Sequence, residues 1–205
     1  MTMTPIAFYV TAKRKLLDQG FAAEIDWQKC QCPTSISERE FLSEAAWVVY
    51  CSGFREAIVR RYFDFISLCF FDWNSAQEIA ATGKLCVAAA MKAMANRRKH
   101  EAVVTIATQV ASVGFESFKR QLVRSPIETL RVLPFLGPVT SIHLAKNLGF
   151  DIAKPDRHLL RLKNHFGYAN VDEMCRNISV ESGDSIKVVD IVLWRYFERH
   201  LDLAD

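Results

Sequence analysis

The sequence has few of the residues that break helices or form tight turns. Glycine and proline together supply 8 + 6 = 14 of its 205 residues, about half the usual share. An all-β sandwich or barrel needs many tight turns and is therefore disfavoured. Hydrophobic residues make up 50% of the chain and charged residues 24%, so a sizeable core can form and long-range disorder is excluded. We expect a mainly helical chain that forms one domain or two interleaved subdomains.

The sequence also lacks a long apolar run. Its longest stretches without a charged residue, such as residues 102–115, are shorter than the roughly 18 apolar residues that a membrane span requires. The first basic cluster, Lys13-Arg14-Lys15, is not followed by an apolar segment and a small-residue cleavage site. We therefore expect no membrane partner and a cytoplasmic protein, associated with the nucleoid if it is bacterial.

The cysteines do not have the spacing of a metal site. The six cysteines include one close pair, Cys30-x-Cys32, and no second pair at the spacing of zinc ligands. We expect reduced thiols, mostly in the core, and no metal ligands. The net charge of +3 is too small to predict nucleic-acid binding by itself, but residues 131–168 carry six basic and two acidic side chains, a local charge of +4.

Capping boxes mark the starts of several helices. In this motif a serine and a glutamate three residues later satisfy each other's backbone N–H groups. Apolar residues at helical spacing predict further helices over residues 85–94, 100–113 and 186–197, and a break at Gly53 between two more. The capping boxes are Ser37-x-x-Glu40, Ser75-x-x-Glu78 and Ser125-x-x-Glu128.

The most informative region spans residues 125–167. Apolar spacing predicts a helix from Ser125 that ends at the turn 134–137, and a second helix from Pro138 to Gly149. The turn is so short that the two helices must form a tight hairpin. The start of the second helix offers backbone N–H groups and a partial positive charge, which favour a phosphate. The candidate phosphate ligands are Gly137, Val139 and Thr140.

A proline and an aspartate after this hairpin predict another helix start. Asp156 follows Pro155 and precedes the apolar residues Leu159 and Leu162. An aspartate at such a position most often caps its helix. Its position alone therefore does not assign it a catalytic role.

The order of these parts resembles the helix-hairpin-helix (HhH-GPD) superfamily of DNA glycosylases. In that family the hairpin reads approximately L-P-G-V-G-x-x-T-A and the catalytic segment V-D-T-H-V. The matching segments here are LPFLGPVTS at 133–141 and PDRHL at 155–159. The family's closing helix, a hydrophobic residue followed by Asp-x-x-Leu-Trp, is matched by VDIVLW at 189–194. The resemblance covers residues 37–200, and its distinctive part is 133–159.

The resemblance implies an all-α fold of two helical subdomains with a cleft between them. We expect an N-terminal helix and linker in residues 1–36, packed on a glycosylase-like body in residues 37–205. A monomer is expected, because one flipped base needs one cleft. Within the body we expect the hairpin at 125–149, the catalytic segment at 151–167 and a C-terminal helix at 184–201.

The resemblance also implies an activity, cleavage of the glycosidic bond of a damaged or modified base in double-stranded DNA. In this class the hairpin holds the DNA and one nucleotide is flipped out of the stack. Cleavage builds positive charge on the sugar, which an ionised Asp156 can stabilise while it orients or deprotonates the attacking water. The expected product is an abasic site.

Three departures from the family pattern refine this expectation. Phe135 replaces the first hairpin glycine, which strains the turn if the backbone there needs a positive φ. Val139 occupies the position of the lysine that bifunctional members use, so we expect a monofunctional enzyme without AP lyase activity; Lys154 and Lys146 are the possible substitutes. The four-cysteine iron–sulfur loop is missing, so no cluster is expected. No cofactor is required, although the resemblance allows a monovalent or divalent ion at the hairpin.

Further DNA contacts are predicted, each with an alternative. Phe54, Arg55 and Trp47 are candidates for a wedge or a base pocket, but Phe54 and Trp47 also fit a core. Asp190 and Trp194 fit a structural role. The basic turn at residues 97–99 either contacts phosphates or is solvated, and His158 is either a DNA contact or a structural histidine. The candidate DNA-binding residues outside the hairpin are Arg157, His158, Arg97, Arg98 and Lys99.

Competing functions stay open at this point. The enzyme could excise an enzymatically hypermodified base from viral DNA, as a phage-defence glycosylase does, instead of repairing damage. A non-catalytic protein could keep the hairpin and bind DNA without base release. A helical scaffold that only mimics the motif would show no salt-dependent affinity for DNA.

Overall fold

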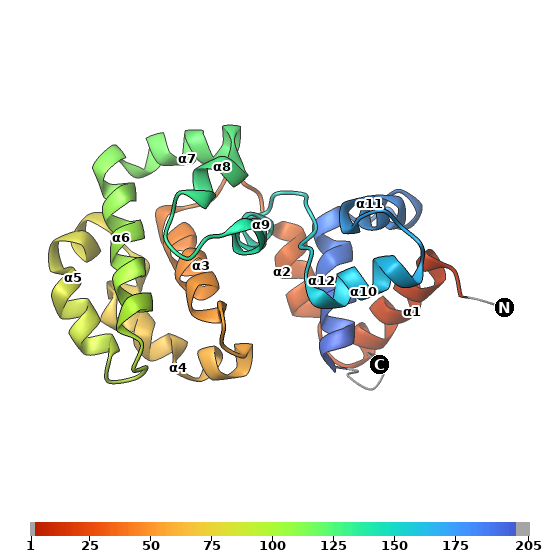
Figure 1. Cartoon of the computed structure of the whole chain (residues 1–205), viewed down its shortest axis with the longest axis horizontal. Coiled ribbons are helices and arrows are strands. Elements are labelled where there is room, and N and C mark those ends of the chain that lie inside the picture. Colours follow the sequence, from red (N-terminus) through yellow and green to blue (C-terminus); the bar gives the residue numbers. More distant parts are fainter. Residues whose placement is uncertain (1–2, 200–205) are drawn as a thin grey trace. The chain divides into compact units, whose positions relative to one another are not determined.

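Residues 3–199 are described in a computed structural model of the chain (Figure 1). Within this range all regular elements are helices, which confirms the all-α expectation for the described residues. The chain divides into two compact units. Unit 1 combines Met1–Cys32 with Gly149–Asp205, and unit 2 is Pro33–Leu148.

Unit 1 is built around its last helix. Most residues of this helix, α12, are buried, because apolar side chains occur on nearly every side of it. It packs against the other four helices of the unit. The helices of unit 1 are α1 (Pro5–Asp18), α2 (Ala22–Cys30), α10 (Arg157–His165), α11 (Val171–Ser182) and α12 (Ile186–Arg199).

The N-terminal helix α1 belongs to the core of unit 1. Leu16 is fully buried in that core. The hydroxyl of the buried Tyr9 donates a hydrogen bond of 2.6 Å to Asp184 Oδ2, and Lys13 Nζ lies 2.6 Å from the same oxygen. The N-terminal helices thus share a core with the C-terminal ones, and the unit boundaries fall at 32/33 and 148/149 instead of at 36/37. Apolar spacing identifies a helix but not the helices it packs against.

Unit 2 is centred on a helix that packs on several neighbours. Helix α3 contacts α4, α6, α9 and η1, and α5 pairs with α6 along its length. Phe41 and Tyr50, both on α3, are among its largest fully buried side chains. The helices of unit 2 are α3 (Glu38–Cys51), α4 (Glu56–Cys69), η1 (Phe71–Trp73), α5 (Ala76–Ala90), α6 (Arg97–Val113), α7 (Phe115–Arg124), α8 (Pro126–Arg131) and α9 (Pro138–Asn147).

Of the three expected capping boxes, one forms completely, one forms in part and one does not form. At Ser37 both reciprocal bonds of the box are present. Ser75 accepts a bond from the Glu78 N–H, so that its half of the motif is formed. Ser125 makes no side-chain cap, and the third box is therefore wrong. Its helix, α8, is only six residues long and begins with a proline, which needs no partner for a backbone N–H.

The helix boundaries differ from several expectations. The helix expected over 85–94 is the second half of α5, which begins at the Ser75 cap and ends at Ala90. The helix expected over 100–113 begins three residues earlier. The break at Gly53 is confirmed, with φ 86° between α3 and α4. The C-terminal helix expected over 184–201 is observed as Ile186–Arg199, and its last two residues lie outside the described range.

Most of the cysteines do not lie in the core. Only Cys86 and Cys175 are buried, whereas Cys51 and Cys69 are half-buried and the close pair Cys30 and Cys32 is exposed. The expectation of mostly buried thiols was therefore wrong. Cys30 ends α2 and Cys32 lies in the loop that follows, where the chain leaves the core of unit 1.

Candidate functional site

The predicted hairpin is present in unit 2, where α8 and α9 pack against each other. Their turn contains Phe135 in the left-handed region with φ 63°. The Thr140 hydroxyl donates a bond of 2.9 Å to the carbonyl oxygen of Phe135 and so holds the turn closed. A non-glycine residue at positive φ costs about 1–3 kcal/mol. The strain anticipated at Phe135 is thus confirmed.

The start of α9 has unused backbone donors. No side chain caps this helix, and its first turn holds no acidic residue. Pro138 has no N–H to satisfy, so the N–H groups of Val139 and Thr140 point out of the first turn without a side-chain partner. Val139 is exposed. Together with the helix dipole, these groups can bind a phosphate oxygen.

Gly137, the N-cap of α9, has a backbone that any residue can adopt, with φ −74° and ψ −169°. A Cβ placed on it would meet only the Thr140 Oγ1 atom, at 4.0 Å. Neither backbone conformation nor packing within the described chain therefore calls for glycine here. A missing side chain at the start of an uncapped helix allows another molecule to approach the backbone closely.

Asp156 lies in unit 1 as the N-cap of α10. Its Oδ1 atom accepts two bonds, from the N–H of His158 at 2.9 Å and the N–H of Leu159 at 3.0 Å. The capping role anticipated from the sequence is confirmed. Its second oxygen, Oδ2, takes no part in this cap, and the side chain is half-buried. A carboxylate that uses one oxygen to fix its own position can present the other to a ligand.

A buried carboxylate supports the loop before Asp156. Asp190 Oδ2, on α12, accepts a bond of 2.7 Å from the N–H of Lys154. Asp190 is almost fully buried, as expected for a structural residue. Because Lys154 lies two residues before Asp156, this bond ties the loop to the central helix of unit 1. The sequence pattern VDIVLW had indicated a structural role for Asp190, and the bond to Lys154 is that role.

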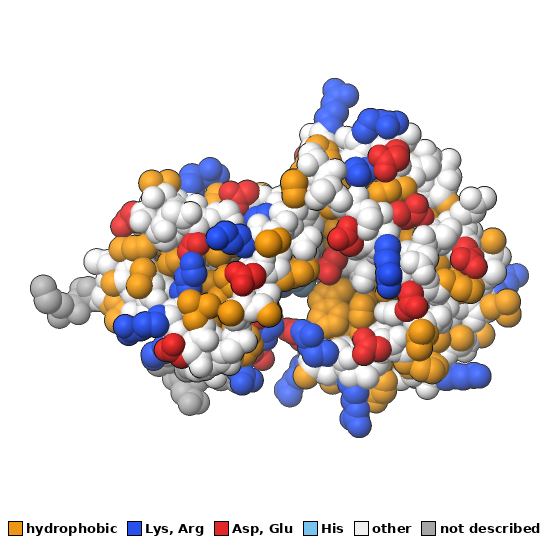
Figure 2. Space-filling model, turned by 180° about the vertical axis from the view of Figure 1, so that it is seen from behind, with side chains coloured by type: hydrophobic (Ala, Val, Ile, Leu, Met, Phe, Trp, Pro, Cys, Tyr) orange, Lys and Arg blue, Asp and Glu red, His pale blue; other side chains and the backbone are white. Residues whose placement is uncertain are grey.

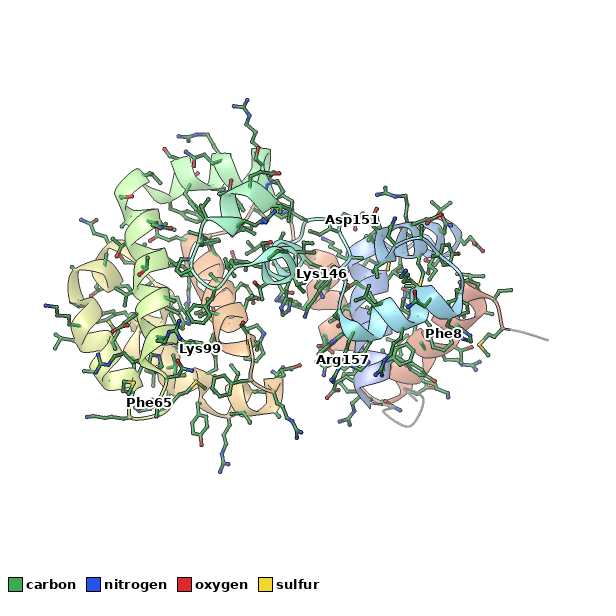
Figure 3. All side chains as sticks on the ribbon, viewed as in Figure 1. Phe8, Phe65, Lys99, Lys146, Asp151 and Arg157 are labelled. Atoms are coloured by element: carbon green, nitrogen blue, oxygen red, sulfur yellow. The ribbon has the colours of Figure 1, made fainter. Side chains whose placement is uncertain are left out.

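His158 packs in the core of unit 1. Its ring stacks on Phe197 at an interplanar angle of 11°, and only 5% of the residue is exposed. Burial lowers the pKa of His158, although Asp156 opposes the shift. This position fits the structural alternative and does not fit the DNA contact predicted for His158. Arg157, next to it, is exposed at the start of α10 (Figure 3).

The basic turn before α6 divides into exposed and buried side chains. Arg97 and Arg98 are exposed, as expected. The Arg97 Nη1 atom lies 3.7 Å from Glu101 Oε1. Lys99 is 96% buried, with its ammonium on the carbonyl oxygens of residues 49, 50 and 52 at the end of α3 (Figure 3). The phosphate contact predicted for Lys99 does not fit this position. Asn96 caps α6, and Lys99, the third residue of this helix, is buried.

The predicted wedge and pocket residues occupy three different environments in unit 2. Phe54 is half-buried, with its ring centroid 5.4 Å from Lys99 Nζ. Arg55 is exposed at the N-cap of α4. Trp47 is half-buried on α3, packed edge-on against Phe63 with the Arg60 guanidinium over its ring. Phe54 and Arg55 therefore share a loop, whereas Trp47 belongs to an aromatic cluster.

A buried polar pair inside this cluster was not predicted from the sequence. The Tyr50 hydroxyl lies 2.8 Å from His100 Nδ1, and His100 Nε2 lies 2.8 Å from the carbonyl oxygen of Met94. The carbonyl can only accept, so Nε2 carries the proton and Nδ1 accepts from Tyr50. Burial lowers the pKa of His100. A histidine and a tyrosine fifty residues apart carry no local signal that they meet.

Charges of both signs are scattered over the visible surface of each unit. Figure 2 shows Lys and Arg side chains interspersed with Asp and Glu on that face. Between residues 3 and 199, no group of three His, Cys, Asp or Glu side chains could hold a metal ion. In the same range, none of the helices combines the length and apolar character of a membrane span.

Comparison with protein-family models, with curated proteins and with solved structures found no match for this chain.

Proposed function

We propose that this protein is a monofunctional DNA N-glycosylase of the helix-hairpin-helix type. One observation carries the proposal. Asp156 caps α10 with its Oδ1 atom, and its Oδ2 atom takes no part in the cap. This aspartate follows a hairpin with an uncapped helix start, in the order and spacing of the family motif.

The hairpin would hold the DNA backbone. A phosphate oxygen can accept from the N–H groups of Val139 and Thr140, and the missing side chain of Gly137 leaves room for it. These contacts carry no sequence information, which suits an enzyme that must scan DNA for one altered base.

Asp156 would act on the sugar of the extruded nucleotide. As the glycosidic bond breaks, the sugar gains positive charge, and a carboxylate facing C1′ stabilises that charge. Oδ2 can also accept a hydrogen bond from the attacking water. The cap bonds and the Asp190 bond to the preceding loop restrict the motion of the carboxylate. The leaving base departs and an abasic site remains.

Strand cleavage is not part of the proposal. The lysine of bifunctional enzymes is replaced by Val139, which cannot form a Schiff base. Lys146, at the end of α9, and Lys154, in the loop before Asp156, are the remaining amines of this region. Trapping of a covalent protein–DNA adduct by borohydride would contradict the monofunctional assignment.

The test compares wild-type protein with Asp156→Asn. The asparagine Oδ1 can accept the same two N–H groups, so the variant keeps the cap and loses the charge. Free bases are detected by mass spectrometry after incubation with alkylated, deaminated, oxidised and hypermodified phage DNA. We expect release by the wild type alone, at least about a hundredfold faster than by the variant, with nicks only after alkali. Equal release by both proteins would disprove the role of Asp156.

The same assay separates the two remaining functions. Release from hypermodified viral DNA alone would assign the enzyme to phage defence. Asp156 has a complete structural role as an N-cap, which favours, as the second candidate, a DNA-binding protein without catalysis. Salt-sensitive binding without any base release would support that candidate.

A further inference from the structure

The backbone of the hairpin turn does not explain why a phenylalanine stands at position 135. It occupies a left-handed position that disfavours a side chain with a Cβ. Burial is only partial, because 38% of the residue is exposed. One contact of the ring is the ammonium group of Lys99, whose Nζ atom lies 5.1 Å from the ring centroid.

Lys99 holds a second aromatic ring in the same way. The Phe54 ring centroid lies 5.4 Å from the same Nζ atom. The ammonium is itself fixed by the carbonyl oxygens of Tyr50 and Ser52, at 3.3 and 2.6 Å, and by that of Val49. One immobile cation thus anchors two rings, one from the hairpin turn and one from the loop after α3. We call Phe54, Lys99 and Phe135 the aromatic clamp.

The surroundings of the aromatic clamp suit a polyanion. Arg55 follows Phe54 in the chain, Arg97 and Arg98 precede Lys99, and all three are exposed. The uncapped start of α9 lies two residues after Phe135. The first turns of α6 and α9 contain no acidic residue. Partly exposed aromatic rings among cationic groups are the usual elements of a site that stacks nucleobases.

We propose that the aromatic clamp is a stacking site for an unpaired nucleobase in duplex DNA. The ring of Phe135 stacks on the exposed π-face of the base, and Phe54 packs on the same Lys99 ammonium that holds Phe135 in place. Arg55, Arg97 and Arg98 neutralise the neighbouring phosphates. This inference rests on the DNA binding of the proposed function and adds to it a residue and a preferred form of DNA.

Phe135→Gly is the decisive variant, because it removes the ring and relieves the backbone. Its unfolding free energy should equal or exceed that of the wild type. Affinities of the full chain are measured for a fully paired duplex and for the same duplex with one base opposite an abasic-site analogue. We expect the wild type to prefer the second duplex, and Phe135→Gly to bind it roughly tenfold more weakly while its affinity for the paired duplex changes less than about twofold.

Two further variants define the outcome. Phe135→Leu keeps the strained turn and its apolar character but has no aromatic face, and it should lose the preference as well. Val132→Ala removes an exposed side chain of the same hairpin and should keep the preference. An unchanged preference in both Phe135 variants would overturn the proposal, as would an equal loss for both duplexes. If the wild type bound neither duplex at low salt, the DNA-binding function itself would fail.

Discussion

At the scale of single residues, the substitution Gly137→Ala tests whether the hairpin binds phosphate. An alanine fits its backbone and meets no atom closer than 4.0 Å, so Gly137→Ala should leave the unfolding free energy within about 0.5 kcal/mol of the wild type. The new methyl group would keep a phosphate away from the N–H groups of α9. Losing one such hydrogen bond costs about 1 kcal/mol, and we expect a roughly fivefold weaker affinity for DNA in a binding titration.

The control for Gly137→Ala lies on the same hairpin. Val132 is 74% exposed, and Val132→Ala should change neither stability nor affinity. A Gly137→Ala protein that binds DNA as the wild type does would place the phosphate contacts elsewhere than at the start of α9.

The burial of His100 should make the free energy of unfolding depend on pH. Burial lowers the pKa of His100 in the folded protein below its ordinary value, and the pKa of His158 is lowered in the same way. Below about pH 6.5 the unfolded chain therefore binds more protons than the folded one, so acid favours unfolding. The free energy of unfolding in urea should fall between pH 7 and pH 5.

A pair of variants isolates this contribution. His100→Gln removes the titrating group and should flatten the pH dependence. His165→Gln makes the same change on an exposed position of α10 and should leave the dependence as it is. If the two variants showed the same slope as the wild type, the acid sensitivity would come from other groups.

The same residues show how far the sequence predicts the site. Asp156 and the strained Phe135 were predictable, because a helix cap and a turn depend on neighbours in the chain. Lys99 and His158 were not, since basic residues next to a predicted site look like ligands until their contacts are known. Their burial depends on the end of α3 and on Phe197, which lie far away in the sequence.

At the scale of elements, Ser37 and Ser125 head capping boxes that look alike in the sequence, but they should contribute differently to the free energy of unfolding. Ser37 forms the complete box, and its bonds lower the pKa of Glu40. Ser37→Ala should reduce the free energy of unfolding by about 1 kcal/mol. Ser125→Ala, where no cap is formed, should change it by less than about 0.5 kcal/mol. Denaturant unfolding measures both, and equal losses would contradict the observed difference.

The helices themselves were easier to predict than their ends. Cap residues and apolar spacing located α3, α5, α6 and α12, because these signals are local. The short helix α8 has no side-chain cap, and its packing on α7 and α9 stabilises it instead. Element ends of this kind depend on the tertiary structure.

At the scale of the whole molecule, the path of the chain determines which parts can fold alone. Unit 2 is one continuous segment, Pro33–Leu148, and contains the hairpin and the aromatic clamp. Unit 1 needs two distant segments, because α1 shares its core with α12 and holds Asp184 through Tyr9 and Lys13. The family resemblance could not predict this, since its distinctive segment ends before α11 and gives no partner for α1.

This division predicts the behaviour of two shortened proteins. A fragment of residues 33–148 should fold with a helical circular dichroism spectrum and one cooperative transition, whereas deletion of residues 1–32 from the full chain should unfold unit 1. The fragment keeps the start of α9 and the exposed Arg55, Arg97 and Arg98, so it should bind DNA with an affinity that falls as salt rises. Because it lacks Asp156, it should release no base. A fragment that binds DNA only after unit 1 is added back would mean that the hairpin does not bind alone, and a fragment that releases bases would remove Asp156 from the mechanism.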